Sequence, residues 1–347
     1  MVGQSSESFS IIVICYKRKN FLLDAVKSVL SQDYPRDKIQ IIVVKAFYDD
    51  EVDSFLKENN IYVVFSDTEY YGKSVADALT AATGNIVCLL DDDDIFYSNK
   101  LSKVSQIFQT DEGIYLSVNN YNIIDRNGAV IKSNFHNAER ENQFKMGPRV
   151  FHSDDYDLPI MLNVLRMTFN SSRMCFRQGI IVNRLDLMSR ILFSVDAIPI
   201  VLCLNDKKSV VSLPEELTGY RIHEKNISLA PSGQINMKKF VVTHTKMMDD
   251  AKVQSEYLAE INESLSLVYS FFFSSQKYKL AILMADKKEA LTASKEVVKK
   301  LLENFQDIWK YRGLFISLPG SILNLSFLPL IIFSPRLARR LRLIFPF

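Results

Sequence analysis

The feature that most constrains the fold of this chain is a run of apolar residues that ends in a run of acids. Ile86 to Leu90 are all apolar, and Asp91 to Asp94 follow without a break. An uninterrupted apolar run of this length is typical of a strand buried on both faces of a parallel sheet. Open α/β sheets bind their ligands just beyond the carboxyl ends of such strands, where the aspartates fall. The run therefore predicts an α/β fold and the place of its site.

Four adjacent carboxylates repel one another, so they need a positive partner or some of them must protonate. Oxygen ligands at this density suit a hard divalent cation such as Mg²⁺ or Mn²⁺. An EF-hand loop counted from Asp91 is excluded, because Phe96 stands where that loop needs Gly and Ser102 where it needs Glu. A solvated acidic turn or helix N-cap is the simpler alternative, but it accounts for one or two aspartates rather than four. We therefore predict a metal-dependent site.

The first part of the chain alternates between strand and helix patterns. Apolar runs predict strands at residues 9–15, 39–44, 61–66 and 86–90. Helical spacing of apolar residues predicts helices at 20–31, 52–57 and 74–83, the last closed by Gly84 as its C′ residue. Strands and helices that alternate with short links form a parallel sheet covered by helices.

Beyond Asp94 the pattern changes. A helix is predicted at 101–108 and strands at 114–119 and 210–213, while residues 174–200 mix both signals. Asn127-Gly128 between apolar residues is the strongest short signal for a tight hairpin. Polar residues 135–158 are predicted to form a long loop near the site, and residues 217–228 an irregular segment.

After Pro231 long amphipathic patterns predict a helical appendage, with helices at 238–273, 277–285 and 288–311. Residues 314–333 then carry no charge, which matches the roughly 20 residues needed to cross a bilayer. They are interrupted by Pro319, Gly320, Asn324 and Pro329, and arginines follow at 336, 339, 340 and 342. Because basic residues flank both ends and favour the cytoplasmic side, a re-entrant or in-plane segment fits better than a span. A hydrophobic tail packed on the domain or a partner is the alternative.

Charge and cysteine usage bound the partners and the compartment. Lys and Arg total 42 and Asp and Glu 40, so no net field attracts nucleic acid, and we expect no such partner. The cysteines lie far apart among apolar neighbours, and we expect them to be reduced core residues of a cytoplasmic protein: Cys15, Cys88, Cys175 and Cys203. The polar residues 1–8 and the short first apolar run do not form a signal peptide.

Two nucleotide-binding motifs are excluded. Gly72-Lys73-Ser74 ends like a P-loop, but the first glycine of that motif would fall at Asp67, and the loop is acidic instead of glycine-rich. No GxGxxG follows the first strand, which argues against a dinucleotide-dependent oxidoreductase.

Five segments in one order resemble family 2 glycosyltransferases of the GT-A fold. They are residues 10–18, residues 28–35 (SVLSQDYP), Gly72 with residues 74–84 and 90–94, Asp125 with Gly128, and residues 217–228. The resemblance covers about 220 residues and implies a Rossmann-like, mostly parallel sheet flanked by helices in residues 1–230. Residues 231–312 would be the helical appendage and residues 313–347 the membrane-associating tail.

The resemblance implies a metal-dependent, inverting glycosyltransferase that moves a sugar from a nucleotide-sugar donor to a lipid-linked or surface glycan acceptor. By position Asp93 would ligate the metal, with Asp91 near the metal or the ribose and His223 as a nitrogen ligand; a structural histidine is the alternative. Arg221 would contact phosphate as a bidentate donor. The implied donor-binding residues are Cys15, Tyr16, Arg18, Lys45, Gly72, Lys73, Asp91, Asp92 and Arg221.

The resemblance also implies a carboxylate, on a helix before the final strand, that takes the proton of the acceptor hydroxyl. Asp196 is the candidate, although the family's Glu-Asp pair is Val195-Asp196 in this chain. A helix cap is the alternative reading of Asp196, and Asp186 and Asp206 are the other candidates.

Lys45 is a second departure, because it stands where the family has the aspartate that contacts the nucleobase. A lysine has no acceptor atom, so either Asp49 or Asp50 substitutes or the base differs. Two rivals stay open: a nucleotidyltransferase of related fold, and a catalytically degenerate subunit that binds a sugar nucleotide. The favoured interpretation is a cytoplasmic enzyme, peripherally or monotopically associated with the cell membrane.

Overall fold

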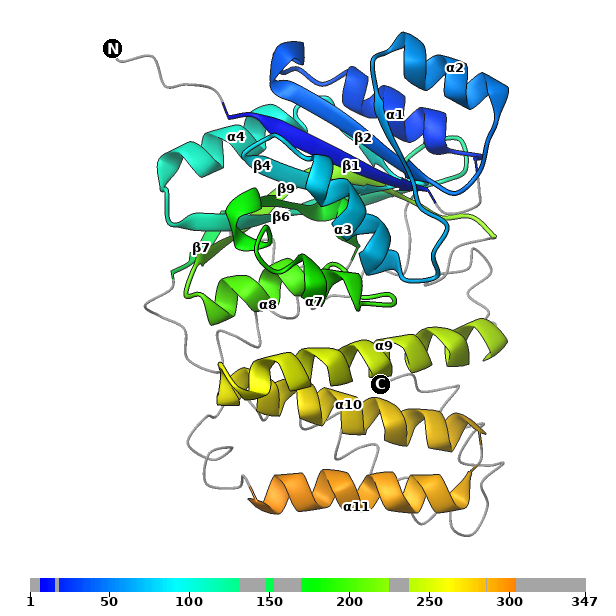
Figure 1. Cartoon of the computed structure of the whole chain (residues 1–347), viewed down its shortest axis with the longest axis vertical. Coiled ribbons are helices and arrows are strands. Elements are labelled where there is room, and N and C mark those ends of the chain that lie inside the picture. Colours follow the sequence, from blue (N-terminus) through cyan, green and yellow to red (C-terminus); the bar gives the residue numbers. More distant parts are fainter. Residues whose placement is uncertain are drawn as a thin grey trace. The chain divides into compact units, whose positions relative to one another are not determined.

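The computed structural model describes residues 7–15, 19–131, 148–152, 170–224, 237–284 and 286–303. Contacts within the chain divide it into two compact units, one formed by Met1–Asp155 and Val164–Gly233, the other by Tyr156–Asn163 and Gln234–Phe347. The first unit holds a sheet with helices on both faces, and the second holds long helices (Figure 1).

Parallel strands form the first half of the sheet: β1 (Phe9–Cys15), β2 (Ile39–Lys45), β3 (Tyr62–Phe65) and β4 (Ile86–Asp91). β1 lies between β2 and β4, so that Ile11 is opposite Ile41 on one side and Cys88 on the other. All residues of β1 are buried, as its unbroken apolar run predicts. Because these strands are parallel, β1, β2 and β4 end along the same edge of the sheet, at Cys15, Lys45 and Asp91.

The second half of the sheet mixes directions. Its described strands are β5 (Ile95–Phe96), β6 (Ile114–Ile124), β7 (Arg149–Phe151), β8 (Met174–Arg177) and β9 (Ser209–Arg221). The order across the sheet is β3-β2-β1-β4-β8-β6-β9-β5, with β7 also paired to β9. β8 is antiparallel to both β4 and β6, whereas β6 and β9 are parallel. β8 therefore joins the two halves.

Helices cover both faces of the sheet (Figure 1). One face is covered by α1 (Leu22–Leu30), α2 (Asp50–Glu58) and α4 (Lys100–Thr110), the other by α3 (Tyr71–Ala81), α7 (Leu185–Ser189) and α8 (Ala197–Asn205). The helical spacing of Leu22, Ala25, Val26 and Val29 gives α1 one apolar face, which is buried in the core with Phe9, Ile11 and Val13 of β1.

The second unit contains α9 (Met237–Ala259), α10 (Glu263–Met284) and α11 (Lys287–Glu303). The predicted helix at 238–273 is wrong, because the chain turns after Ala259 and α10 runs through the predicted break at 273–277. The turn is explained by Asn262, whose side-chain oxygen accepts a hydrogen bond from Leu265 N (3.1 Å) at the start of α10. Within the described part of the chain, no helix has the length and apolar character needed to cross a bilayer. Residues 314–333 lie outside it.

Three other local predictions need correction. Residues 217–221, predicted as irregular, are the second half of β9, and residues 149–151 of the predicted loop form β7. α3 begins at Tyr71, so Gly72 and Lys73 are helical instead of lying in a loop. The hairpin at Asn127-Gly128 is confirmed: Gly128 has φ +86°, and Asp125 N donates to Ala129 O (2.8 Å).

Cys88 on β4 and Cys175 on β8 lie opposite each other with Cα atoms 4.2 Å apart, and they form a disulfide. Cys15 and Cys203 remain buried thiols. The expectation of reduced cysteines is therefore wrong for the first pair, because only the pairing of β4 with β8 makes these distant residues neighbours. The cysteines no longer argue for a reducing compartment.

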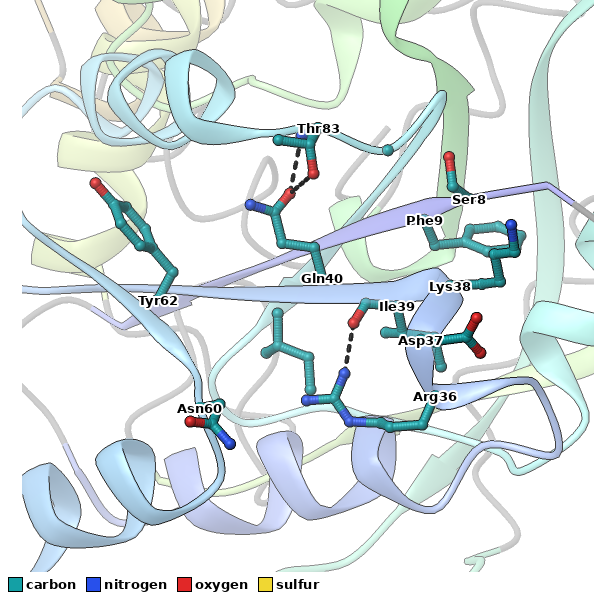
Figure 2. A pocket seen from close by; sticks show the side chains of 12 residues that line it. Ser8, Phe9, Arg36, Asp37, Lys38, Ile39, Gln40, Asn60, Tyr62 and Thr83 are labelled. Atoms are coloured by element: carbon teal, nitrogen blue, oxygen red, sulfur yellow. Dashed lines mark hydrogen bonds between the residues drawn. The ribbon is translucent and has the colours of Figure 1, made fainter.

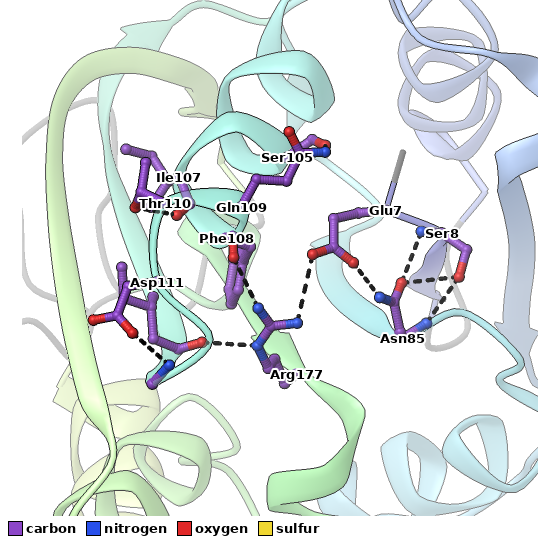
Figure 3. Close-up of polar contacts among 12 residues, drawn as sticks. Glu7, Ser8, Asn85, Ser105, Ile107, Phe108, Gln109, Thr110, Asp111 and Arg177 are labelled. Atoms are coloured by element: carbon purple, nitrogen blue, oxygen red, sulfur yellow. Dashed lines mark hydrogen bonds and ion pairs between the residues drawn. The ribbon is translucent and has the colours of Figure 1, made fainter. Parts of the chain in front are cut away.

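Polar contacts fasten the amino end of β1 to the second half of the sheet (Figure 3). Arg177 on β8 donates to the carbonyls of Ile114 (2.9 Å) and Phe108 (2.8 Å) and pairs with Glu7 (3.5 Å). Asn85, which precedes β4, donates to Glu7 and accepts from Ser8 N (2.7 Å). Arg177 thus stabilises the edge of the sheet opposite the aspartates.

Gly84 does not act as the predicted C′ residue, because α3 ends at Ala81 and Gly84 has no positive φ. Glycine is required there for another reason: a Cβ atom would lie 2.4 Å from Phe9 C and 2.5 Å from Ser10 N, both main-chain atoms of β1.

We expect Gly84→Ala to lower the free energy of unfolding by about 1–3 kcal/mol, as overpacking does. Urea unfolding measures this. Gly179→Ala, where a Cβ meets nothing within 4 Å, is the matched control, and equal midpoints for the two variants would contradict the argument.

Candidate functional site

The aspartates follow β4 at the carboxyl edge of the sheet, beside the end of β1. Asp92 N donates to Ile14 O (3.2 Å), and Cys15 Sγ donates to Asp92 Oδ2 (3.3 Å). These contacts extend the β1–β4 pairing beyond the strands and hold Asp92 against β1. The predicted donor residue Cys15 is thus a direct neighbour of the acidic run.

Asp91 is held from two sides. The hydroxyl of Tyr71, the first residue of α3, donates to Asp91 Oδ1, and Ser171 Oγ donates to the same oxygen (2.9 Å). Ser171 belongs to a 3₁₀ turn, Ser171–Arg173, that leads into β8. Burial and the neighbouring Asp91 carboxylate raise the pKa of Tyr71 well above its usual value, so its hydroxyl remains a donor at neutral pH.

Asp94 is almost fully buried and accepts three hydrogen bonds. They come from Asn170 Nδ2 (2.7 Å), Ser172 Oγ (2.7 Å) and Arg221 N (3.0 Å). Burial, followed by the charges of Asp93 and Asp91, raises the pKa of Asp94 well above the usual value, against the pull of these donors. Asp94 therefore experiences the repulsion expected within the acidic run, in addition to the cost of its burial.

Asp93 lies beside His223, with Asp93 Oδ2 and His223 Nε2 3.0 Å apart. Both residues are buried, with 6 % and 4 % of their surface exposed. His223 is brought there by β9, whose last residue, Arg221, donates from Nε to Asp93 O (2.7 Å). The structure thus brings Asp93 and His223 together, although they are 130 residues apart in sequence.

Buried cations of the chain lie close to the acids. Arg221 is 2 % exposed and also donates from Nη1 to Arg126 O (2.7 Å). Lys100 is fully buried at the start of α4, where its Nζ donates to Ser172 O (2.6 Å) and Thr218 Oγ1 (3.1 Å). Burial, and then the charge of Arg173, lowers the pKa of Lys100 well below its usual value, while Asp94 acts in the opposite direction. The guanidinium of Arg221 offsets part of the charge of the aspartates without any ligand.

The Asp93–His223 pair fits a shared divalent cation. Two ligand atoms that each lie about 2.1 Å from one ion, at right angles, are about 3 Å apart, which matches their separation. Among the described residues, no group of three or more His, Cys, Asp or Glu side chains is arranged to hold a metal ion. Asp91 is therefore not gathered with Asp93 and His223 as predicted, and a cation on this pair would need further oxygen ligands from a bound molecule.

Asp196 immediately precedes α8, and α8 is the helix that comes before β9. This is the region of the chain in which the candidate base was predicted. It is half-buried, and within the described chain its carboxylate makes no capping hydrogen bond to α8, contrary to the alternative reading. The segment before it is fastened to α3: Ile191 O accepts from Gly72 N (3.0 Å) and Leu192 O from Tyr71 N (3.4 Å). Since Tyr71 also bonds Asp91, these contacts connect the acidic run with the Asp196 segment.

Lys45 ends β2 at the same edge of the sheet but points inward. Its Nζ pairs with Asp53 Oδ1 (2.7 Å) and donates to Phe47 O (2.5 Å). The hydrogen bond from Lys45 lowers the pKa of Asp53. Asp49, a suggested substitute for the base-contacting aspartate, caps α2 at Val52 N (3.1 Å) and pairs with Lys19.

Other predicted donor residues take structural positions. Gly72 is buried in the first turn of α3, where a Cβ would lie 2.0 Å from Met188 O, so it allows α3 to approach α7 closely. Lys73 pairs with Asp77 one turn along α3. Arg221 donates to the main-chain carbonyls of Asp93 and Arg126, and its contact with phosphate stays a prediction. Tyr16 and Arg18 lie outside the described residues.

A surface pocket lies at the amino ends of β1 and β2, away from the aspartates (Figure 2). Gln40 in it accepts from Thr83 N (2.8 Å), and Arg36 donates to Ile39 O (2.5 Å). None of the residues that line the pocket belongs to the site built on Asp93.

Sequence reasoning missed the side chains that bond to the aspartates, which are Tyr71, Asn170, Ser171 and Ser172. It also missed Lys100, which donates to Ser172 O and Thr218 beside them. The available signal for three of them was a short polar run immediately before an apolar strand at Met174. Nothing in the sequence marks Tyr71 or Lys100, because their contacts depend on how α3 and α4 pack.

Comparisons with known proteins concern the family and the fold. Residues 10–173 match the family model described as glycosyl transferase family 2. An uncharacterized glycosyltransferase of Nostoc sp. is 24 % identical over 281 residues, which cover 75 % of this chain and 80 % of that protein. An uncharacterized glycosyltransferase of Rickettsia bellii is 22 % identical over 162 residues, 46 % of this chain and 23 % of that protein.

A crystal structure of S. aureus TarS in complex with UDP superposes with a TM-score of 0.50 at 13 % identity, covering 86 % of this chain and 91 % of that chain. At this identity the likeness concerns the fold alone. It confirms the predicted α/β fold of the GT-A type.

Proposed function

From the match of residues 10–173 to the model of family 2 glycosyltransferases, we propose that this chain moves a sugar from a nucleotide-diphospho donor to a hydroxyl group of a lipid-linked or surface glycan. The observation that carries the proposal is the contact between Asp93 and His223 at the carboxyl edge of the sheet. Ligands of open α/β sheets bind at that edge. The UDP in the complex with TarS makes uridine diphosphate the first nucleotide to test.

Asp93 Oδ2 and His223 Nε2 would together hold Mg²⁺ or Mn²⁺, and the donor's diphosphate would supply further oxygen ligands. A bound divalent cation neutralises the charge that develops as the nucleoside diphosphate departs. Arg221 supports this arrangement from behind, since it holds the main chain of Asp93 through the bond to its carbonyl. Tyr71 and Ser171 keep Asp91 directed at the same edge.

Asp196 is the proposed base of an inverting reaction. Its carboxylate would accept the proton of the acceptor hydroxyl while that oxygen forms a bond to the anomeric carbon of the sugar. The bond between this carbon and the diphosphate oxygen breaks, and the electron pair leaves with the nucleoside diphosphate. The position of Asp196 before α8, on a segment fastened to Tyr71 and Gly72, supports this role.

A thermal-shift panel of nucleotide sugars, each with and without Mn²⁺, tests the proposal, followed by product analysis of the best donor. We expect a metal-dependent stabilisation by one donor and release of free nucleoside diphosphate. Release of pyrophosphate would instead indicate nucleotidyl transfer. Donor binding with hydrolysis at the background rate would indicate a degenerate binding subunit.

The acceptor proposal depends on the tail at residues 313–347, with its uncharged run and basic flanks. We expect truncation after Arg312 to abolish sedimentation of the protein with anionic vesicles, because the run and its arginines are the proposed contact with the cytoplasmic face of the membrane. Activity toward a short soluble acceptor should survive the truncation, whereas activity toward a lipid-linked acceptor should fall.

A double substitution separates charge from apolar contact. Arg339→Glu with Arg340→Glu should weaken vesicle binding, since each basic residue near an anionic surface contributes about 1 kcal/mol. Added salt should then matter less for this variant than for the wild type, because the screened attraction has been removed. Full-length protein that stays in the supernatant with vesicles would show that the tail is a packing element.

A further inference from the structure

Phe21, which no step of the proposed reaction uses, touches both residues that hold Asp93. Its ring lies 5.0 Å from the imidazole of His223, centroid to centroid, at an interplanar angle of 40°. On the same ring the guanidinium carbon of Arg221 lies 4.6 Å from the centroid. Phe21 is the residue that precedes α1, so it comes from the opposite end of the domain sequence.

The two contacts act on Asp93 from different directions. His223 meets the Asp93 side chain through Nε2, whereas Arg221 meets its main-chain carbonyl through Nε. A hydrogen bond to one ring nitrogen fixes the position of that atom but leaves the imidazole plane able to rotate about the bond. A packed ring beside the imidazole removes that freedom, and outer partners of this kind orient metal-binding histidines.

We propose that Phe21 is a positioning residue of this site, which holds the His223 ring in the orientation where Nε2 faces Asp93 and keeps Arg221 on the main chain of Asp93. This inference rests on the proposed function for its consequence, because the pair it positions is the proposed cation site. The contact with Arg221 adds an attraction between a cation and an aromatic face. Asp24, 3.6 Å from Arg221 Nη2 on the first turn of α1, supports the guanidinium from the same helix.

Histidine ring NMR of the metal-free protein tests the positioning itself. The chain has four histidines, and His223→Gln identifies the His223 resonance by its loss. In Phe21→Leu we expect the His223 signal to move, because the ring current of Phe21 is gone, and to broaden as the imidazole plane becomes mobile. Phe21→Tyr keeps a ring and should keep the wild-type signal.

Direct Mn²⁺ binding in the presence of UDP, followed by electron paramagnetic resonance, tests the consequence. Phe21→Leu should weaken Mn²⁺ binding about tenfold, the size of effect seen when an outer partner of a metal ligand is lost, and Phe21→Tyr should restore it. Phe55→Leu is the matched control. Phe55 is also a half-buried aromatic residue, and Lys27 Nζ lies 5.6 Å from the centroid of its ring. It belongs to α2 and does not contact the residues that hold Asp93.

The outcomes are separable. An unchanged His223 signal and unchanged Mn²⁺ affinity in Phe21→Leu would overturn the inference, as would an equal loss of affinity in Phe55→Leu. If wild-type protein itself fails to bind Mn²⁺ with UDP, the proposed metal role is wrong, yet the His223 signal in Phe21→Leu and Phe21→Tyr still decides whether Phe21 positions the imidazole.

Discussion

Asp93→Asn should abolish metal-dependent donor binding while the protein stays folded. Asparagine has nearly the same shape and can still hydrogen-bond to His223, but it lacks the charge that makes a carboxylate a ligand for Mn²⁺. Loss of a directly bound ligand should weaken Mn²⁺ binding by at least about 100-fold, the upper end of what loss of an outer partner costs. Calorimetric titration of the donor with and without Mn²⁺ measures this.

The control for Asp93→Asn is Asp111→Asn. Asp111 lies in an exposed turn after α4, where Oδ1 accepts from Gly113 N (2.7 Å), at the end of α4 opposite to Lys100. It should bind donor as the wild type does. If Asp93→Asn also binds donor with wild-type affinity and metal dependence, Asp93 is not the ligand.

Asp196→Asn should lower turnover by at least about 100-fold, the low end for loss of a general base, with donor affinity little changed. An amide cannot accept the proton of the acceptor hydroxyl, whereas the donor would bind at the aspartates, which Asp196→Asn leaves intact. Steady-state kinetics with saturating donor and varied acceptor measure the effect.

Asp206 and Asp186 are the control positions for Asp196→Asn. Asp206 is paired with Arg184 (2.9 Å), and Asp186 lies exposed on α7, so neither should act as the base. Asp206→Asn and Asp186→Asn should retain turnover. An active Asp196→Asn beside an inactive Asp186→Asn or Asp206→Asn would move the role to that carboxylate.

The apolar strands could be predicted because β1, β2 and β4 are buried on both faces, which their unbroken apolar runs express directly. The second half of β9 could not. Thr218 can be buried there because its hydroxyl accepts a hydrogen bond from Lys100. Arg221 can be buried because it donates hydrogen bonds to Asp93 and Asp94. In the sequence, polar residues that are paired inside a sheet resemble a loop.

The position of the acidic residues of the candidate site could be predicted from the sequence, whereas the contacts of its cationic residues could not. The run at the end of β4 and the motif that contains His223 led to the Asp93–His223 contact. Arg221 and Lys45 were expected to face a donor, yet both bond to carbonyl groups of the chain. A sequence shows that a cation is present, whereas packing determines whether it meets a ligand or the main chain.

The strand order has a consequence for how fast the site can form during folding. β1 pairs with β2 across 30 residues and β2 with β3 across 20, so these three strands can assemble early, whereas β4 pairs with β1 across 77. Asp94 likewise meets Ser172 across 78 residues, and Asp93 meets His223 across 130. Closing such long loops costs entropy before any contact rewards it, which slows folding. The aspartates therefore stay exposed and repel one another until β8 and β9 pair with the sheet. The site is among the last parts of the domain to form during folding.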